Sequence, residues 1–338
     1  MRRRHFALRH VPSVGGTAFV LAVSALVLAA APSKSTAQDS YPSRPIRLLV
    51  GFAPGGATDV ISRVIGAKLG DALGQPIIVE NRPGVSSNIA TLAAARSTPD
   101  GYTLLMGTNS NAANESLFKD SRFKFADDFT PIALLAAAPC LVVSHPSFEA
   151  KTIQEIIALA RDRPGQVNYG TGGPGTIGHL AGELISMVSG VKLTAIPYRG
   201  GAEAVKDLLS GEVKLHISTP NLFMPLIKEG RIRAIATTGP ERSSLSPDIP
   251  TIAEAGFPGF DLRLWFGLVA PAGTPKEIVQ KLAAAARTAI ASPEVQSALS
   301  AQGYDPVVTG TPEDFAAFIR VEIDRAAKIV KATGMKPE

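Results

Sequence analysis

The sequence predicts an α/β fold organised as two lobes. A chain of 338 residues suggests two domains at the usual ~100–200 residues per domain. Strand-like and helix-like apolar runs alternate along most of the chain, which is typical of helices layered on largely parallel sheets. Segments near residues 140 and 263 look like crossings between domains. Two crossings would leave a cleft that closes by hinge motion. Two consecutive independent domains are the alternative.

The first 37 residues have the pattern of a secretory signal peptide. Four arginines precede an uncharged apolar stretch, and Ser35 and Ala37 are small residues at the positions of an A-x-A-like cleavage site. The apolar core is short compared with the ~20 residues of a spanning helix. We therefore expect cleavage and export to the periplasm, by the general or the twin-arginine route. An uncleaved membrane anchor is the alternative.

The basic character of the chain belongs to this export segment. The segment holds five of the 34 lysines and arginines and none of the 29 acids, so the mature chain is neutral. A neutral chain gives no reason to expect a nucleic-acid partner. Cys140 is the single cysteine, so no intramolecular disulfide can form, and we expect it to pack as a small buried hydrophobe.

The regular elements can be placed in chain order from their apolar spacing. The expected helix at 60–73 carries apolar residues three and four positions apart, which marks one buried face. The last helix is expected to start with Thr311 as its cap and Pro312 at its first position. The expected strands are 46–50, 77–80, 102–106, 141–144, 167–169 and 193–197, and the expected helices are 60–73, 88–95, 153–161, 177–188, 202–209, 276–291 and 311–331.

Two glycine-rich loops join an expected strand to an expected helix. They are G-F-A-P-G-G-A-T-D at 51–59 and G-T-G-G-P-G at 170–175. The first turn of a helix exposes unpaired N–H groups and the positive end of the helix dipole, and both favour an anion. Thr58, Thr171 and Thr176 add hydroxyl donors. A carboxylate could be held there without a countercharge, although Gly55-Gly56 could instead serve only a tight turn.

Sequence motifs for catalysis, metals and cofactors are weak or absent. The second loop matches G-x-G-x-x-G, but no acid follows the next strand and Pro174 removes a donor, so we do not expect a nicotinamide cofactor. The chain has no P-loop, nucleophile elbow or H-E-x-x-H motif, and its histidines lack metal-ligand spacing. We expect no catalytic residue, metal or cofactor. A secreted enzyme acting on a small carboxylate in the same cleft is the alternative.

Several short motifs occur in order from Tyr41 onward. They include Y-P-S-R-P-I-R-L-L-V-G-F-A-P-G-G-A-T-D at 41–59, E-N-R-P-G at 80–84, P-D-G-Y-T at 99–103, P-Y-R-G-G at 197–201 and W-F-G at 265–267. With these motifs the sequence resembles the Bug (TctC-type) family of extracytoplasmic solute receptors. The resemblance implies a type II-like periplasmic binding fold. Lobe 1 would comprise 38–140 and 263–338, and lobe 2 would comprise 141–262, each a mostly parallel sheet flanked by helices, with the ligand cleft between them.

The resemblance also implies a function and a set of site residues. A monomer would capture a small carboxylate (a di- or tricarboxylate, an amino acid or an aromatic acid) by backbone amides and hydroxyls. It would deliver the ligand to a tripartite tricarboxylate-type permease, with TctA/TctB-like subunits, or to a sensor kinase. The expected ligand-binding residues are Phe52, Pro54, Gly55, Gly56, Ala57, Thr58, Asp59, Thr108, Asn109, Thr171, Gly173, Gly175, Thr176, His179, Tyr198, Ser218 and Thr219.

Several positions depart from the pattern common in the family. Thr171 and Pro174 stand where a serine and an asparagine are common, and Ser86-Ser87 stand where a glycine pair is frequent. Ser218-Thr219 replace a frequent Asp-Asn, which leaves that part of the expected cleft without an acid. These differences bear on which carboxylate is bound rather than on the fold.

Overall fold

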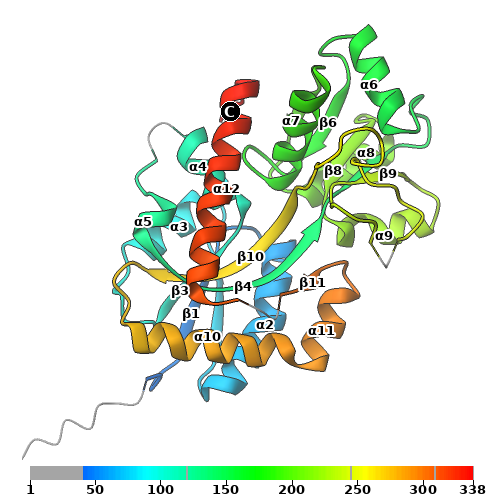
Figure 1. The fold of residues 1–338 in the computed structure, drawn as a ribbon. Helices are drawn as coiled ribbons and strands as arrows, with labels where there is room; N and C mark the ends of the chain where they lie inside the picture. The colour runs from blue at the N-terminus through cyan, green and yellow to red at the C-terminus, as the bar shows by residue number, and fades with distance from the viewer. Residues whose placement is uncertain (1–40, 119–120, 244–245, 308–309, 338) are drawn as a thin grey trace, which may run out of the picture. The chain divides into compact units, whose positions relative to one another are not determined.

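The computed structural model describes residues 41–118, 121–243, 246–307 and 310–337. The predicted signal peptide at 1–37 lies outside these residues. Among the residues described, every helix is too short or too polar to cross a lipid bilayer. Two β-sheets, each with helices packed on it, make up this part of the chain (Figure 1), so the predicted α/β class is confirmed.

The first sheet has six strands in the order β11-β4-β10-β3-β1-β2. β1 pairs in parallel with β2 and β3, whereas β10 runs antiparallel to both β3 and β4. All five residues of β3 are buried, as expected for a central strand covered on both faces. The strands are β1 (Ile46–Val50), β2 (Ile77–Asn81), β3 (Thr103–Gly107), β4 (Phe129–Pro139), β10 (Arg263–Pro271) and β11 (Asp305–Pro306).

The second sheet has five strands in the order β7-β6-β8-β5-β9. β6 pairs in parallel with β7 and β8, and β5 runs antiparallel to β8 and β9. Both sheets are therefore mixed rather than mostly parallel as predicted, because the strands through which the chain passes from one sheet to the other pair antiparallel. The strands are β5 (Leu141–Ser144), β6 (Asn168–Thr171), β7 (Thr194–Pro197), β8 (Leu215–Ser218) and β9 (Arg233–Thr237).

The helices begin and end where the local sequence supplies caps. α12 starts with a capping box between Thr311 and Asp314, has Pro312 in its first turn and ends at the left-handed Gly334. α2 likewise ends at Gly74, whose φ is 71°. The helices are α2 (Ala57–Leu73), α3 (Asn88–Ala95), α4 (Asn109–Leu117), α5 (Phe125–Asp128), α6 (Ile153–Asp162), α7 (Ile177–Ser189), α8 (Gly201–Ser210), α9 (Pro220–Lys228), α10 (Lys276–Ala291), α11 (Pro293–Ser300) and α12 (Pro312–Thr333).

Thr238 ties together the two segments where the chain passes between the sheets. Cys140 separates β4 from β5, and it is fully buried as expected. Its backbone N–H donates to the Thr238 hydroxyl oxygen at 2.7 Å, and that hydroxyl donates to the Leu262 carbonyl oxygen at 2.6 Å. Leu262 directly precedes β10, so a single buried hydroxyl bonds the outgoing and the returning chain.

Three consecutive non-glycine residues in the β2–α3 loop have left-handed backbone conformations. The φ angles of Val85, Ser86 and Ser87 are 46°, 50° and 78°. A β-branched residue is rare in this region because its Cβ crowds the following carbonyl. Asn114 of α4 donates from its side-chain amide to the Ser86 carbonyl at 2.7 Å, and Ser86 Oγ donates to the Pro174 carbonyl at 2.5 Å. The strained loop thus contacts the loop that follows β6.

Candidate functional site

Five helix N-termini, drawn from both halves of the chain, meet at one cavity. The cavity measures about 270 Å³, and it is lined by the N-cap residues of α2, α4, α7, α8 and α9. Those caps are Gly56, Thr108, Thr176, Gly200 and Thr219. Each of these helices has at least nine residues, so each brings unpaired N–H groups and a positive dipole end. The cavity is therefore suited to an anion.

Asp59 holds the loop between β1 and α2 in its conformation through hydrogen bonds. The Gly55 N–H, on a residue with φ of 80°, donates to Asp59 Oδ2 at 2.9 Å. Asn81 Nδ2 donates to Asp59 Oδ1 at 2.9 Å and to the Phe52 carbonyl at 3.1 Å, which joins both ends of the loop to β2. Burial raises the pKa of the Asp59 carboxyl, but bonds from Arg63, Gly55 and Asn81 outweigh it and lower that pKa. An ionised Asp59 thus holds the loop in place.

Three residues that line the cavity have side-chain hydroxyls that are not used within the protein. Thr58, Ser110 and Ser218 are 5%, 3% and 9% exposed. Within the described chain, the side-chain hydroxyls of these three residues have no hydrogen-bond partner. None of the three oxygens is completely enclosed by protein. Each hydroxyl can therefore donate to a molecule in the cavity.

The loop between β6 and α7 is stabilised mainly by its own residues. Thr171 is fully buried, and its hydroxyl oxygen accepts from the Gly173 N–H at 3.1 Å. Thr176 Oγ1 donates to the Gly173 carbonyl at 2.7 Å. Gly173 has a φ of 114°, and a Cβ there would lie 3.0 Å from the Tyr198 carbonyl oxygen. Glycine is required here because the loop packs closely against the end of β7.

Ten of the seventeen residues expected to bind ligand line the cavity, and seven do not. Those that line it are Phe52, Pro54, Gly55, Gly56, Ala57, Thr58, Thr108, Thr176, Ser218 and Thr219. Those that do not are Asp59, Asn109, Thr171, Gly173, Gly175, His179 and Tyr198. Ligand contact by any of the seventeen stays a prediction.

Two of the residues outside the lining, His179 and Tyr198, have side chains close to acidic groups of the protein, although His179 Nδ1 has no hydrogen-bond partner in the described chain. His179 Nε2 lies 3.9 Å from Glu183 Oε1 on α7, and burial lowers the pKa of His179 to about 4. The Tyr198 hydroxyl donates to Asp207 Oδ2 at 2.7 Å. The first contact lies within α7, and the second joins the end of β7 to α8.

Sequence reasoning missed another group of residues that line the cavity. The recurring arrangement of a glycine pair before a helix, at P-Y-R-G-G, was the one available signal for the α8 loop. Ser110 and Leu222 gave no signal, because α4 and α9 were not expected as helices. Leu264 gave none, because no strand was expected at β10. Four further lining residues, Ala53, Gly172, Ile177 and Gly178, lie in or directly after the two expected loops but were not named as ligand-binding. The missed lining residues outside these loops are Ser110, Arg199, Gly200, Gly201, Ala202, Leu222 and Leu264.

Buried Glu322 of α12 holds the start of α4 against β10. Its Oε2 accepts from Asn109 Nδ2 and from Trp265 Nε1, both at 3.1 Å, and Arg325 lies 3.0 Å from Oε1. Asn109 Oδ1 accepts in turn from the Trp265 N–H at 3.1 Å. Burial raises the pKa of Glu322, and the charge of Arg325 and the bond from Trp265 do not offset it. The network fixes the residue next to Thr108, which lines the cavity.

Replacing Glu322 by leucine is expected to lower the free energy of unfolding by roughly 2–3 kcal/mol, because two buried donors lose their acceptor. Glu322→Gln keeps an amide oxygen that can accept from Asn109 and Trp265, so it should lose less than half as much. Urea denaturation of both variants measures the difference. Equal losses in the two variants would contradict a hydrogen-bonding role for this carboxylate.

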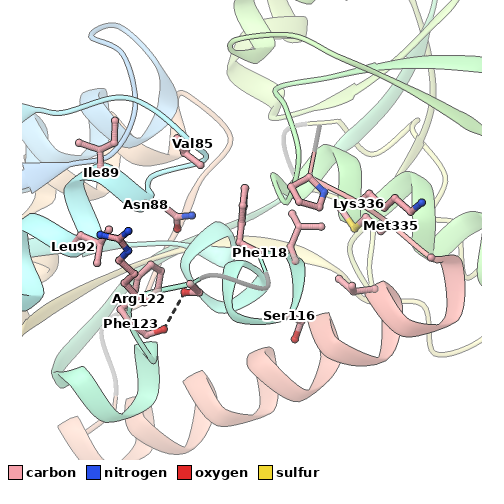
Figure 2. Close-up of a pocket in the computed structure, with 15 residues that line it drawn as sticks. Val85, Asn88, Ile89, Leu92, Ser116, Phe118, Arg122, Phe123, Met335 and Lys336 are labelled. Carbon is pink, nitrogen blue, oxygen red and sulfur yellow. Dashed lines mark hydrogen bonds between the residues drawn. The ribbon is translucent and has the colours of Figure 1, made fainter.

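A larger groove of about 720 Å³ lies at the other end of α4. Figure 2 shows Val85 and Ile89 on one side of it, Phe118 toward the middle, and Met335 and Lys336 on the other side. The helices α4 and α12 border this groove with their C-terminal residues, and helix C-termini carry the negative dipole end. The groove is larger and holds Arg122 and Lys336, but α3 is the one helix of the described chain that starts in its lining. We therefore assign the anion site to the smaller cavity, where five helix N-termini meet.

Metal binding finds no support in the part of the chain that the structure describes. Within it, no three histidine, cysteine, aspartate or glutamate side chains gather closely enough to hold an ion. The chemistry available at the cavity is hydrogen bonding from backbone N–H groups and hydroxyls, together with the positive charge of Arg199.

Comparisons with known proteins agree with a receptor architecture. The model of a family described as the tripartite tricarboxylate transporter family receptor (TctC) matches residues 61–335. The sequence is 38% identical to protein BugT of Bordetella pertussis over 320 residues, covering 94% of this chain and 98% of BugT. The structure is similar to an R. palustris protein solved with adipate, at 36% identity and a TM-score of 0.81, covering 88% of this chain and 100% of that one.

A second solved structure gives the same result. It is MatC from Rhodopseudomonas palustris with bound malate, which is 32% identical, with a TM-score of 0.79 and coverage of 86% of this chain and 100% of MatC. The structure of the periplasmic binding protein BugD is also similar, at 31% identity and a TM-score of 0.80, covering 88% of this chain and 100% of BugD. The predicted two-lobed periplasmic binding fold is thereby confirmed.

Proposed function

We propose that this chain, which belongs to the tripartite tricarboxylate transporter receptor family, captures a small carboxylate at the cavity where the five helix N-termini meet. Proteins of this family are solute-binding receptors rather than enzymes. Relatives that share 36% and 32% of its sequence were solved with adipate and malate, both dicarboxylates. A carboxylate is thus the ligand class that fits both the family and the cavity.

The convergence of helix N-termini carries this proposal. α2 and α4 follow strands β1 and β3 of the first sheet, and α7, α8 and α9 follow strands β6, β7 and β8 of the second. Their N–H groups would bind carboxylate oxygens through charge-assisted hydrogen bonds, and Thr58 and Ser110 would add hydroxyl donors. Phe52, Ile177 and Leu264 give the same cavity apolar surface for the carbon skeleton of the ligand.

The proposal includes two lobes that move as units. Lobe 1 would comprise 38–140 and 263–338, and lobe 2 would comprise 141–262. In support, the chain changes sheet between β4 and β5 and again before β10, and Thr238 bonds both passages to each other. Closure about these passages would bring the loops of β1 and β6 onto the ligand. The closed receptor, exported by a cleaved signal peptide, would then deliver the ligand as a monomer to a tripartite permease or to a sensor kinase.

Titration calorimetry of the mature chain with succinate, malate, adipate and benzoate tests the proposal. We expect saturable binding of at least one acid, and small-angle scattering should report compaction on binding. Absence of binding by every acid would overturn the proposed function.

Thr58→Val tests the assigned cavity because it exchanges a hydroxyl for a methyl group of similar size. We expect affinity for the bound acid to fall roughly tenfold or more, since a hydrogen bond to a charged group contributes about 1.5–3 kcal/mol. Thr288→Val on α10, whose hydroxyl bonds only within its own helix, is the matched control and should bind normally. Equal affinity of the two variants would place the ligand elsewhere.

A further inference from the structure

We propose that Ser218 and the N-terminus of α8 make the cleft select against ligands that carry an ammonium group. The ligand would then be a carboxylic acid without an amine, whose far end is uncharged or anionic. This inference rests on the proposed function, because it divides the carboxylates that the cavity could hold into two classes.

The charges around the cavity are all of one sign. Arg199 is the single ionisable side chain in its lining, and no aspartate or glutamate is among the lining residues that the structure describes. Arg199 is exposed, and its guanidinium forms no ion pair within the described chain. Each of the five helix N-termini adds partial positive charge. The potential inside the cavity therefore favours anions and disfavours cations.

Two carboxylates lie in the first turns of the helices whose N-termini line the cavity, and both accept hydrogen bonds from the protein. Asp59 in the first turn of α2 accepts from Gly55, Asn81 and Arg63. Glu203 in the first turn of α8 accepts from the Arg199 backbone N–H at 3.0 Å. Neither residue lines the cavity. An ammonium group on the ligand would find no carboxylate to pair with.

The space between the Ser218 hydroxyl and Gly201, here called the notch, can bind a hydrogen-bond acceptor of the ligand. A Cβ at Gly201, the first residue of α8, would lie 2.7 Å from Ser218 Oγ, so glycine leaves the hydroxyl open beside the helix N-terminus. Ser218 is 9% exposed, and its hydroxyl has no partner in the described chain. Hydroxyl and N–H donors here can bind an oxygen of the ligand, whereas an ammonium group would meet the positive end of the helix dipole.

Burial makes the discrimination strong. An ammonium group that leaves water without a partner carries a large desolvation cost, whereas an uncharged methylene at the same place carries none. Leu222 and Leu264 also line the cavity, and they provide apolar surroundings for such a methylene group. The difference should therefore appear between acids that are identical apart from the amine.

Matched ligand pairs test the inference. Succinate is compared with L-aspartate, and adipate with L-2-aminoadipate, by calorimetry on the mature chain. We expect the acid without the amine to bind at least about tenfold tighter in each pair that gives binding. An amino acid that binds as tightly as its matched acid would overturn the inference and leave the proposed function standing. Failure of every probe to bind would overturn both.

A charge introduced at position 218 tests whether the selection against ammonium groups is made at this residue. Ser218→Asp places a carboxylate in the notch and should shift the ratio of the two dissociation constants at least tenfold toward the amino acid. Ser218→Asn has nearly the same size without the charge and should leave the ratio unchanged. A ratio that moves equally in both variants would show that size, not charge, governs the selection, and would overturn it.

A second position keeps the test independent of how well the Ser218 variants fold. Ala202 lines the cavity from the first turn of α8, where an acid favours the helix. Ala202→Asp should shift the ratio in the same direction as Ser218→Asp. No shift in a folded Ala202→Asp variant, judged by its melting temperature, would contradict a selection made by charge at this end of the cleft.

Discussion

The variant Gly178→Ala is expected to lose ligand binding by a hundredfold or more and to unfold at a lower urea concentration. Gly178 lies in the first turn of α7 and lines the cavity. A Cβ on this residue would lie 2.1 Å from the Ile217 carbonyl oxygen of β8, which is backbone and cannot rotate away. The start of α7 would have to move away from β8, and the N–H groups that line the cavity would move with it. Displacements of this kind cost far more than the loss of one contact.

Gly66→Ala is the matched control for that experiment. Gly66 lies inside α2, and a Cβ there would come no closer than 3.4 Å to the flexible Ile77 side chain. Alanine favours a helix interior over glycine by about 1 kcal/mol, so this variant should be as stable as the parent or more stable. Calorimetry and urea denaturation of both variants measure the effect. Normal binding by Gly178→Ala would show that the α7 N-terminus does not contact the ligand.

Acid is expected to destabilise the protein through His216. The ring is fully buried on β8, and neither of its nitrogens has a hydrogen-bond partner in the described chain. Phe223 packs edge-on against it at 5.0 Å between ring centroids. Burial lowers the pKa of His216 to about 3, whereas in the unfolded chain a histidine titrates near 6.5. Between these values the unfolded chain binds a proton that the folded protein does not.

The direction and size of the effect follow from this linkage. The folded protein has its full stability with respect to His216 above pH ~6.5, and this contribution is lost progressively as the pH falls toward 3. Between pH 6 and pH 4, His216 alone should remove roughly 2–3 kcal/mol from the free energy of unfolding, at about 1.4 kcal/mol per pH unit. His179, whose pKa burial lowers to about 4, should add to the loss in the same range.

Urea denaturation at pH 7, 6, 5 and 4 measures this dependence. His216→Leu should show a shallower decline, so that its advantage over the parent grows as the pH falls. His145→Gln is the control, because His145 lies in a turn where Ser147 Oγ bonds its Nδ1 at 2.7 Å. Parallel pH curves for the parent and His216→Leu would contradict the assignment.

Much of the fold, and about half of the residues that line the cavity, could be predicted from short stretches of the sequence. The glycine-rich turns after β1 and β6 were predicted because only a loop with glycine can turn so sharply from strand to helix. The last helix was predicted from its Thr311 and Pro312 start, and the structure has both. Signals of this kind are local, so they can be read without knowing what the segment packs against.

The missed elements depend on contacts with distant residues. α4 reads as a polar loop because it is rich in asparagine, yet Asn111 and Asn114 are fully buried and bond to the loop and helix at 86–91. β4 reads as an irregular crossing because it contains Pro131 and Pro139, but β10 pairs with it along nearly its whole length. The same long-range packing brings Ser110 and Leu264 to the cavity, so neither residue could be predicted from its local sequence.

The five converging helix N-termini have a consequence for how binding responds to conditions. Backbone N–H groups do not titrate near neutral pH, and no substitution other than proline removes one. Above the pH at which the fold begins to weaken, the affinity should therefore follow the ionisation of the ligand rather than that of the receptor. In the proposed mode of binding, side chains that leave the backbone in place could vary while the N–H groups still bind the carboxylate. A receptor built in this way can change its preferred acid by altering a few side chains while keeping the same anchor.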